Sequence, residues 1–598
     1  MKGRAPLLIG ALVGLALVMR LVHLHADPPM GLSSSRSIYN DGGAYALNAR
    51  FRLLTGHWIA PGDNVCAQTP GYTLIAWLMF RIFGLGLIPL RGLSILGTMA
   101  ALILISWWTR RAWGGAAALL TALILSTSYI FTMYGRLELI EGLLVGPVTA
   151  GVVAAAASVC WAENQWAHRM NEQALDTDPC TRPDRSKTAS RSTEFHGAPI
   201  VLASLSALLL SGSYLIKPTS IVVAAAVVLF LAFSAWTGFY TRAGGEASGS
   251  AFIPNSRPLR PKTWLVAPFI AFIATTTILI SLYVGLFYIP YHHLFAVYRE
   301  AFRQNAQDLW DLRAPIVCLR VLTVPGIWDL RGLPLALLVV AGLSAVSRAA
   351  REAPMGAARS WGILMALWLF LGLLYFAPQT YRPSRFTVLF VPPAAALAAR
   401  GCLWLWSTGK SVRGPGPAAG IAWLIYLAAA ALVQLEYPPD RDLGKNQGLL
   451  LLLMSVWAAT AWGRRREPLR PVIARAAGTL LTGILIVSGL VEYGVWALHP
   501  HESLVSSEQT SIRLIAKSPS AGDNWCMAAA LMHDSPAYKI DWLPVTEGEL
   551  RRLGVHYLIV DAQEDRMLEL YAPLLKRSTL LCSERIGPYR IHILKTPW

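Results

Sequence analysis

Residues 101–141 read ALILISWWTRRAWGGAAALLTALILSTSYIFTMYGRLELIE, and this stretch determines how the chain is organised. Two apolar runs flank Arg110-Arg111, and the second run leads into Arg136-Leu-Glu138-Leu-Ile-Glu141. The first polar link is therefore basic and otherwise plain, whereas the second contains carboxylates. Loops rich in Lys and Arg stay on the cytoplasmic side of a membrane. The stretch predicts a membrane protein whose reactive groups gather on the opposite, outer face.

The same alternation continues along the rest of the sequence. Further plain basic links lie at Lys2/Arg4, 169–191, 257–262, 348–351, 410–413 and 464–466. The links that carry acids, aromatic residues, histidines or prolines lie at 41–45, 136–141, 217–218, 291–293 and 382–385. Because all candidate chemistry falls on one face, we predict an enzyme that acts at that face.

Composition supports the membrane class and argues against nucleic-acid binding. The chain has 598 residues, of which 55% are hydrophobic and 14% charged, and its mean hydropathy is +0.46. Soluble proteins carry about 25% charged residues. The net charge of +18 sits mostly in short links between apolar runs, where it orients helices, so we expect no nucleic-acid partner. The seven cysteines show no spacing typical of a metal site.

Thirteen apolar runs are long enough to be read as membrane spans, since a span needs about 20 residues. The run after Lys2 and Arg4 is longer than the 7–15 residues of a signal-peptide core, so we predict an uncleaved first span. The predicted spans are 5–25, 88–108, 115–134, 141–161, 198–216, 219–238, 264–289, 331–347, 360–378, 386–406, 418–436, 447–463 and 472–492.

The basic links orient these spans, with the N-terminus in the cytoplasm and the C-terminus outside. Residues 70–84 are apolar but short for a crossing, and counting them as a span would put Arg110-Arg111 outside. We therefore predict that residues 26–87 form one long external loop. In this loop, 70–84 is an interfacial or re-entrant piece, and 46–56 is a short amphipathic helix lying in the membrane interface.

The last hundred residues differ in character from the rest. We divide the chain into a transmembrane domain, residues 1–492, and an external soluble domain, residues 493–598. Within the latter, residues 554–561 (GVHYLIVD) predict a buried parallel strand of a small α/β domain. The overall fold class is thus mainly α, a polytopic bundle with a small C-terminal α/β domain. Cys526 and Cys582 both lie in this domain, where they either pair or remain free.

Asp41 is the first candidate for chemistry. It is followed by Gly42-Gly43, which allow close backbone approach, and by Tyr45, whose ring suits a membrane interface or stacking against a sugar. An isolated loop aspartate is often only a solvated cap or turn residue. The second acidic link weighs against that reading, because ionisable groups at a membrane are expensive to keep.

The second link supplies Glu138 and Glu141. Three residues apart, they are predicted to share one face at the start of a helix, near the dipole end that favours carboxylates. They are otherwise ordinary acids of a helix N-terminus. Lys217, before Pro218, either binds a phosphate or snorkels to the interface.

Two later links complete the candidate residues. His292 and His293 are adjacent and would point in different directions, so they do not suggest a metal site, and an aromatic belt at the interface also explains them. Arg382 and Arg385 flank Pro383-Ser384 at a helix start, where two guanidinium groups suit a phosphate or pyrophosphate.

Taken in order, these motifs resemble the polytopic glycosyltransferases of the GT-C class. The branch most similar contains the protein O-mannosyltransferase-like enzymes and the aminoarabinose transferases of lipid A. The matching residues are Asp41-Gly-Gly-Ala-Tyr45, Leu54-Thr-Gly-His-Trp58, Thr69-Pro-Gly-Tyr72, Phe83-Gly84, Arg91, Gly135 to Glu141, Lys217, Arg385-Phe386 and Pro392-Pro393.

The resemblance implies a reaction and a place for it. Such enzymes transfer a sugar, with inversion, from a polyprenyl-phosphate carrier to a protein, lipid or glycan acceptor on the outer face of the bacterial inner membrane. It implies that Asp41 is the central catalytic acid and Glu141 the second-loop acid. Lys217, Arg382 and Arg385 would bind the lipid phosphate, and Tyr45, Arg136, Glu138 and His292 would contact substrate.

Two departures from the family pattern affect these expectations. Gly42 stands where an acid often follows the first aspartate, and Gln68-Thr69 stand where the aminoarabinose branch has an acidic-basic pair. A lipid A-type substrate is therefore in doubt. A divalent cation is possible but not favoured, and we predict no metal ligands and no certain cofactor.

A transporter or lipid flippase is the main alternative. That class predicts ionisable residues within spans and broken helices in repeated halves, whereas here the charges lie at one face and the halves show no repeat. An O-antigen polymerase or ligase is a third possibility. Those enzymes usually carry their long loop late in the chain, whereas here the richest loop comes first.

Overall fold

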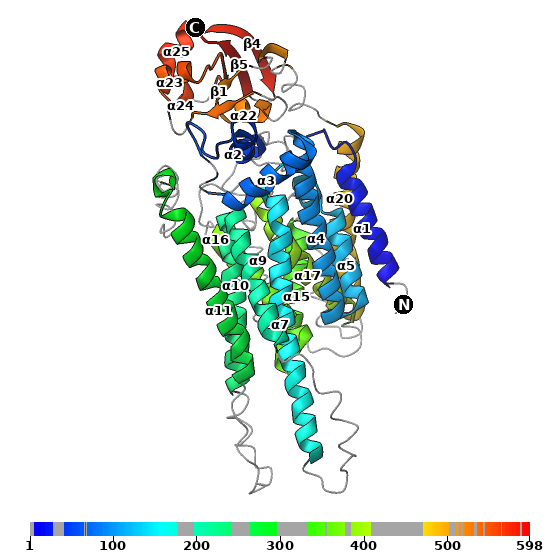
Figure 1. Cartoon of the computed structure of the whole chain (residues 1–598). Coiled ribbons are helices and arrows are strands. Elements are labelled where there is room, and N and C mark those ends of the chain that lie inside the picture. The colour runs from blue at the N-terminus through cyan, green and yellow to red at the C-terminus, as the bar shows by residue number, and fades with distance from the viewer. Residues whose placement is uncertain are drawn as a thin grey trace, which may run out of the picture.

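The computed structural model shows an elongated helical bundle with a small sheet domain at one end (Figure 1). We call the end of the bundle that faces the sheet domain the domain end. The structure describes residues 5–27, 41–64, 66, 68–176, 197–240, 263–295, 332–352, 356–376, 384–407, 470–500, 510, 513–515, 518–530, 535–541, 544–563, 565–586 and 589–598.

Long apolar helices build the bundle because only a helix satisfies its own backbone hydrogen bonds within a membrane. Within the described residues, seven helices are long and apolar enough to cross one. The bundle helices are α1 (Ala5–Leu21), α4 (Leu87–Trp113), α5 (Gly115–Thr127), α6 (Tyr129–Tyr134), α7 (Ile140–Asp176), α9 (Ala198–Ile216), α10 (Ile221–Tyr240), α11 (Thr263–Tyr283), α15 (Gly332–Glu352), α16 (Ala357–Phe376), α17 (Val391–Ser407) and α20 (Arg470–Leu498).

The predicted polytopic helical bundle is confirmed, and eleven of the thirteen predicted spans fall on these helices. The spans 418–436 and 447–463 lie outside the described residues, so the count of thirteen stays a prediction. One span differs in detail: 115–134 is broken at Ser128, whose side chain accepts a hydrogen bond from the Phe131 amide and caps α6.

Small residues let the central helices approach closely, as is common in membrane bundles. A Cβ added at Gly97 of α4 would lie 2.3 Å from the carbonyl oxygen of Gly142 in α7. A Cβ at Gly342 of α15 would lie 2.0 Å from the carbonyl oxygen of Leu397 in α17. Both pairs of helices are therefore in backbone contact, and a side chain at either glycine would push them apart.

The first loop contains two helices, α2 (Asp41–Thr55) and α3 (Pro70–Phe83). The short helix over 70–83 agrees with the prediction that this segment is not a full span. The prediction for 46–56 is wrong in part. A helix is present, but it begins at Asp41 and both its sides are covered by protein, with α3 on one side and the sheet domain on the other. Figure 1 shows α2 between these two parts.

The C-terminal domain is a five-stranded sheet in the order β2-β1-β3-β5-β4 with short helices around it. Strand β3 pairs in parallel with β1 and antiparallel with β5, so the predicted parallel strand is the centre of a mixed sheet. The elements are β1 (Ser520–Gly522), α22 (Asn524–Ala530), β2 (Ala537–Lys539), α23 (Glu547–Arg552), β3 (Tyr557–Asp561), α24 (Asp565–Leu570), α25 (Ala572–Arg577), β4 (Thr579–Ile586) and β5 (Tyr589–Lys595).

Two details of this region refine the sequence analysis. Helix α20 continues to Leu498, past the predicted domain boundary at residue 493. Cys526 is buried in α22 and Cys582 lies on β4, and both thiols are free, so the structure takes the unpaired alternative.

Candidate functional site

Four chain segments that are far apart in sequence meet at the domain end of the bundle. They are the first turn of α2, the first turn of α7, the junction between α9 and α10, and the short 3-10 helix η9 (Ser384–Leu389). They bring together two acids and two cations, which we call the open cluster: Asp41, Glu141, Lys217 and Arg385.

Arg385 joins the two acids of the open cluster. Its Nη2 lies 2.7 Å from Oδ2 of Asp41, and its Nε lies 3.3 Å from Oε1 of Glu141. Lys217 donates a hydrogen bond to the same Glu141 oxygen. The formal charges of the four side chains cancel, so these ions are stable at the edge of an apolar bundle.

The sequence around Lys217 explains how its ammonium group reaches the site. A residue before proline is disfavoured in the α region, and Lys217, before Pro218, is extended with φ −155° and ψ 127°. Helix α9 therefore ends at Ile216, and the chain resumes in the 3-10 turn η4 (Pro218–Ser220) before α10. The helical break places a buried cation at the domain end rather than along a helix face.

Gly42 explains how Asp41 comes close to the bundle. A Cβ at Gly42 would lie 2.0 Å from Cγ of Glu138 and 2.9 Å from the Glu138 carbonyl oxygen. A side chain at this position would therefore push the first turn of α2 away from the loop before α7. This glycine stands where the family that the sequence resembles often has an acid, and the close contact gives a physical reason for the departure.

Aromatic rings line one side of the open cluster. The Lys217 ammonium nitrogen lies 4.2 Å from the centre of the Phe386 ring and 5.8 Å from that of Tyr45. The Tyr45 ring in turn meets Tyr72 edge to face at 6.3 Å. The predicted association of Tyr45 with the site is therefore consistent with its position, whereas Phe386 was noted in the sequence only as part of a family motif.

Exposure separates the members of the open cluster. The Asp41 side chain is 21% exposed, compared with 3% for Glu141. Oε2 of Glu141 is buried and has no hydrogen-bond partner among the described residues. Asp41 is thus the carboxylate that an incoming molecule reaches first, and Glu141 lies behind it.

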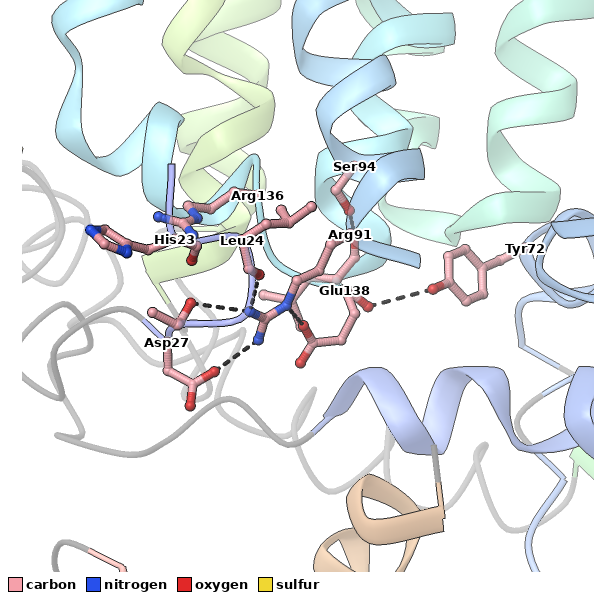
Figure 2. A network of polar contacts seen from close by, with 10 residues as sticks. His23, Leu24, Asp27, Tyr72, Arg91, Ser94, Arg136 and Glu138 are labelled. Carbon is pink, nitrogen blue, oxygen red and sulfur yellow. Dashed lines mark hydrogen bonds and ion pairs between the residues drawn. The ribbon is translucent and has the colours of Figure 1, made fainter. Parts of the chain in front are cut away.

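A second ion cluster lies beside the first, and we call it the sealed cluster: Asp27, Arg91 and Glu138 (Figure 2). Arg91 of α4 donates to Oε2 of Glu138 at 2.9 Å and to Oδ1 of Asp27 at 2.8 Å. Its remaining Nη1 donates to the carbonyl oxygens of Leu24 and Ala26. Every nitrogen of this guanidinium group is therefore used within the protein.

The prediction that Glu138 and Glu141 share a helix face is wrong. Helix α7 begins only at Ile140, so Glu138 lies in the turn before it. The Glu138 carboxylate faces Arg91, whereas that of Glu141 faces Lys217 and Arg385. The turn separates two acids that are close in sequence into different clusters.

Arg136 belongs to the surroundings of the sealed cluster. Its Nη2 donates to the carbonyl oxygen of His23, and its guanidinium carbon lies 4.1 Å from the centre of the Trp496 ring. Burial, reinforced by the charge of Arg91, lowers the pKa of Arg136 to about 9. Arg136 and Glu138 are both almost fully buried, so the geometry does not support their predicted contact with substrate.

The last two predicted site residues are not part of either cluster as described. His292 is exposed beyond α11, where its Nδ1 lies 3.1 Å from the Ile289 carbonyl oxygen and its ring lies against His293. Arg382 lies outside the described residues. Asp27 is a member of the sealed cluster that was not among the predicted site residues, although an acid soon after the first span was a signal for it.

Metal binding is not indicated by the described side chains. Among the residues that the structure describes, no group of three or more His, Cys, Asp or Glu side chains is arranged to hold an ion. Both acids of the open cluster face cations. That the reaction requires no metal ion stays a prediction.

No protein-family model matches the chain, and no curated protein matches it by sequence. By structure, the chain is similar to ArnT from Cupriavidus metallidurans. The ArnT structure bound to undecaprenyl phosphate aligns with a TM-score of 0.50 and 13% identity, over 100% of this chain and 98% of that one. The apo ArnT structure aligns with a TM-score of 0.50 and 14% identity, over 99% and 98%.

The archaeal oligosaccharyltransferase AglB from Archaeoglobus fulgidus, solved with an inhibitory peptide and a dolichol-phosphate, aligns more weakly. Its TM-score is 0.42 and its identity 11%, over 94% of this chain and 71% of that one. The likeness to ArnT extends over the whole chain, sheet domain included. The predicted GT-C-like fold is therefore confirmed.

Proposed function

We propose that the protein is an integral-membrane glycosyltransferase that moves a sugar from a polyprenyl-phosphate donor to an acceptor hydroxyl. The observation that carries the proposal is the open cluster. It places one accessible acid, Asp41, against the buried Arg385, and it places the buried Lys217 and Arg385 together against Glu141, at the domain end of a GT-C-like bundle. ArnT, which shares the fold, has been solved with undecaprenyl phosphate.

The two cations supply the donor side of this reaction. A departing lipid phosphate gains negative charge as the bond to the sugar breaks, and cations held in a site of low dielectric constant stabilise that charge. In the absence of donor, Arg385 and Lys217 are neutralised by Asp41 and Glu141. A phosphate would take over part of the role of these carboxylates as partner of the cations.

Asp41 supplies the acceptor side. Inversion requires the acceptor oxygen to attack from the face opposite the leaving phosphate, and a positioned carboxylate removes its proton. When phosphate binds Arg385, Asp41 loses part of its ion pair and becomes a better base. Glu141 stays behind both cations and keeps them aimed at the same place.

The length of helix α4 supports a proposal about how the bundle lies in a membrane. Arg91 lies at the domain end of α4, and Arg110 lies 19 residues further along the helix. At 1.5 Å per residue, this separation is about 29 Å, the thickness of a hydrocarbon core. We propose that the domain end faces the outside of a bacterial inner membrane, with the N-terminus in the cytoplasm, as the basic links favour.

The test is a transfer assay with purified protein and a matched pair of variants. Wild-type protein and Asp41→Asn are incubated with a lipid extract that contains polyprenyl-phosphate sugars, and mass spectrometry follows release of the free polyprenyl phosphate. Asparagine keeps the shape of aspartate but cannot accept the proton, so we expect turnover to fall about 10²–10⁴-fold.

The control is Asp27→Asn, which removes a carboxylate of the sealed cluster and leaves the open cluster intact. Asp41→Asn protein that turns over as fast as wild type would remove Asp41 from the mechanism. Movement of intact lipid-linked sugar across vesicles, without cleavage, would instead favour the transporter or flippase.

A further inference from the structure

The C-terminal domain holds the first loop at the place where domains of this architecture usually bind ligands. In sheets with parallel strands, ligands bind beyond the carboxyl ends of the strands, where the chain changes direction along the sheet. Here the chain passes from β1 to β2 on one side and then to β3 on the other. An aspartate follows or ends each of these strands: Asp523, Asp541 and Asp561.

The first loop occupies this edge of the sheet. The Asp63 amide donates to the Lys539 carbonyl oxygen at 2.9 Å. The Lys539 ammonium group lies 2.7 Å from Oδ2 of Asp63 and 2.6 Å from Oδ1 of Asp541. All three side chains are buried. Gly62 has φ +85°, and a Cβ there would lie 2.3 Å from the Lys539 carbonyl oxygen, so glycine is needed for this close approach.

Buried hydrogen bonds continue from this contact to α2. Asn64 stabilises the turn through the Ala60 amide and carbonyl, and its Oδ1 accepts a hydrogen bond from Asn48 of α2 at 2.8 Å. Asn48 also donates to the Trp58 carbonyl oxygen. The loop after α2 is thus tied to the middle of the helix on one side and to Lys539 on the other.

Apolar packing fixes the rest of α2 on the same domain. Ala44 and Leu47 belong to a buried cluster with Trp525, Cys526 and Ile591. Ala44 is only three residues after Asp41, so the C-terminal domain covers the helix almost up to its reactive end. Asp41 at that end faces Arg385 of the bundle.

We propose that Lys539 and Asp63 are positioning residues for Asp41, and that the C-terminal domain supports and orients helix α2 in the transfer reaction. The inference rests on the proposed function. The C-terminal domain, predicted as a separate soluble domain of residues 493–598, thereby takes part in positioning a catalytic group. The ion pair between Lys539 and Asp63 holds the loop, the loop holds α2, and α2 holds the Asp41 carboxylate against Arg385.

The experiment weakens the ion pair between Lys539 and Asp63 without removing the C-terminal domain. Asp63→Asn keeps the shape of the side chain and leaves Lys539 paired with Asp541, so the domain keeps its own ion pair. Lys539→Met serves as the second variant. Glu547→Gln is the matched control, because Glu547 forms an exposed ion pair with Arg577 on the same domain.

Two readouts separate positioning from general stability. Hydrogen exchange followed by mass spectrometry should be faster in peptides from 41–55 of Asp63→Asn than in wild type, with exchange in α4 and α7 unchanged. Turnover should fall about 10–100-fold, with the Michaelis constant for the donor within about threefold of wild type, because misplacing a catalytic group by 1 Å costs about that much.

The outcomes have different meanings. Exchange over 41–55 equal to that of wild type, or faster exchange with unchanged turnover, overturns the positioning proposal. A wild-type protein that transfers no sugar overturns the proposed function instead, and the exchange data would still test the mechanical link between Lys539 and α2.

Discussion

The open and sealed clusters each hold an arginine between an aspartate and a glutamate, and the open cluster adds Lys217, but the clusters differ in how accessible their charged groups are. In the sealed cluster, Arg91 donates hydrogen bonds to two carboxylates and two backbone carbonyl oxygens, and its side chain has no exposed surface. In the open cluster, Arg385 faces Asp41, whose side chain is 21% exposed. The comparison teaches that accessibility, rather than the presence of buried ion pairs, distinguishes a candidate site from structural support.

The two clusters also differ in the kind of chain that carries them. The sealed cluster joins the segment that follows α1, helix α4 and the turn before α7, and α4 contacts both α1 and α7 in the bundle. The open cluster includes residues from the first turn of α2, which packs against the C-terminal domain, and from the helix break at Lys217-Pro218. Variants at Arg91, Glu138, Glu141 and Arg385 test whether this division into support and chemistry is correct.

The largest effect is expected from Arg91→Met. It leaves the buried carboxylates of Asp27 and Glu138 without their cation, and breaking such a pair costs about 3–5 kcal/mol. The free energy of unfolding, measured by titration with a denaturing detergent, should fall by that amount. Arg110→Met, at the exposed end of the same helix, serves as control and should change little. Equal stability of the two variants would show that the sealed cluster is not structural support.

Glu138→Gln and Glu141→Gln compare the clusters through two acids three residues apart. We expect Glu141→Gln to lose about 10–100-fold in turnover, since a hydrogen bond to a charged group contributes about 1.5–3 kcal/mol. Glu138→Gln should lower stability while each folded molecule keeps near wild-type turnover. The measurement is turnover per folded protein, determined after size-exclusion chromatography. The reverse pattern would exchange the roles of the two clusters.

Arg385→Ala tests the donor side of the open cluster. Loss of a charge-assisted hydrogen bond should weaken binding of undecaprenyl phosphate by about 1.5–3 kcal/mol, measured as Kd with purified protein in detergent. Arg136→Ala is the matched control, because Arg136 is fully buried against Trp496 and should not contact the lipid phosphate. Affinity that falls only in the Arg136 variant would move the donor site to the sealed cluster.

The last prediction concerns the pH dependence of stability and an acid that is held by amides rather than by a cation. Asp523 accepts hydrogen bonds from the Trp525 and Asp561 amides. Burial nevertheless raises its pKa from 3.8 to about 7, and the nearby charges of Asp541 and Asp561 add to this. A raised folded-state pKa contributes stability that is fully present below the unfolded value and is lost as pH rises through the folded one.

The unfolding temperature of the protein should therefore fall as the pH rises from about 4 to about 7, between the unfolded and the folded pKa of Asp523. Within this window Asp523 changes the free energy of unfolding by at most about 1.4 kcal/mol per pH unit. Asp63, whose pKa burial raises to about 6, contributes with the same sign. Asp523→Asn should flatten the profile, and an unchanged slope in that variant would assign the pH dependence to other groups.

Several features could be predicted because they depend on local sequence. Apolar runs and basic links predicted most of the described helices, and the residues 554–561 predicted a central strand. Lys217-Pro218 marked a break between two helices, because proline restricts the residue before it. Asp41, Glu141, Lys217 and Arg385 were all chosen from the sequence, and the structure brings these four together.

Other features could not be predicted because they depend on contacts between distant segments. The pattern at 46–56 indicated an amphipathic helix, but periodicity cannot distinguish a membrane surface from the apolar face of another domain. Glu138 and Glu141 carry the same charge in the same link, and only the start of α7 at Ile140 separates their directions.

The sequence by itself determined the apolar helices, their sidedness as a prediction, and the set of residues able to do chemistry, because these depend on composition and spacing along the chain. Only the tertiary structure decided which acid meets which cation. Arg91 and Arg385 lie almost 300 residues apart in sequence, and each is buried beside different partners. Charge pairing in a bundle follows from which helix ends pack together, and that packing is a property of the whole chain.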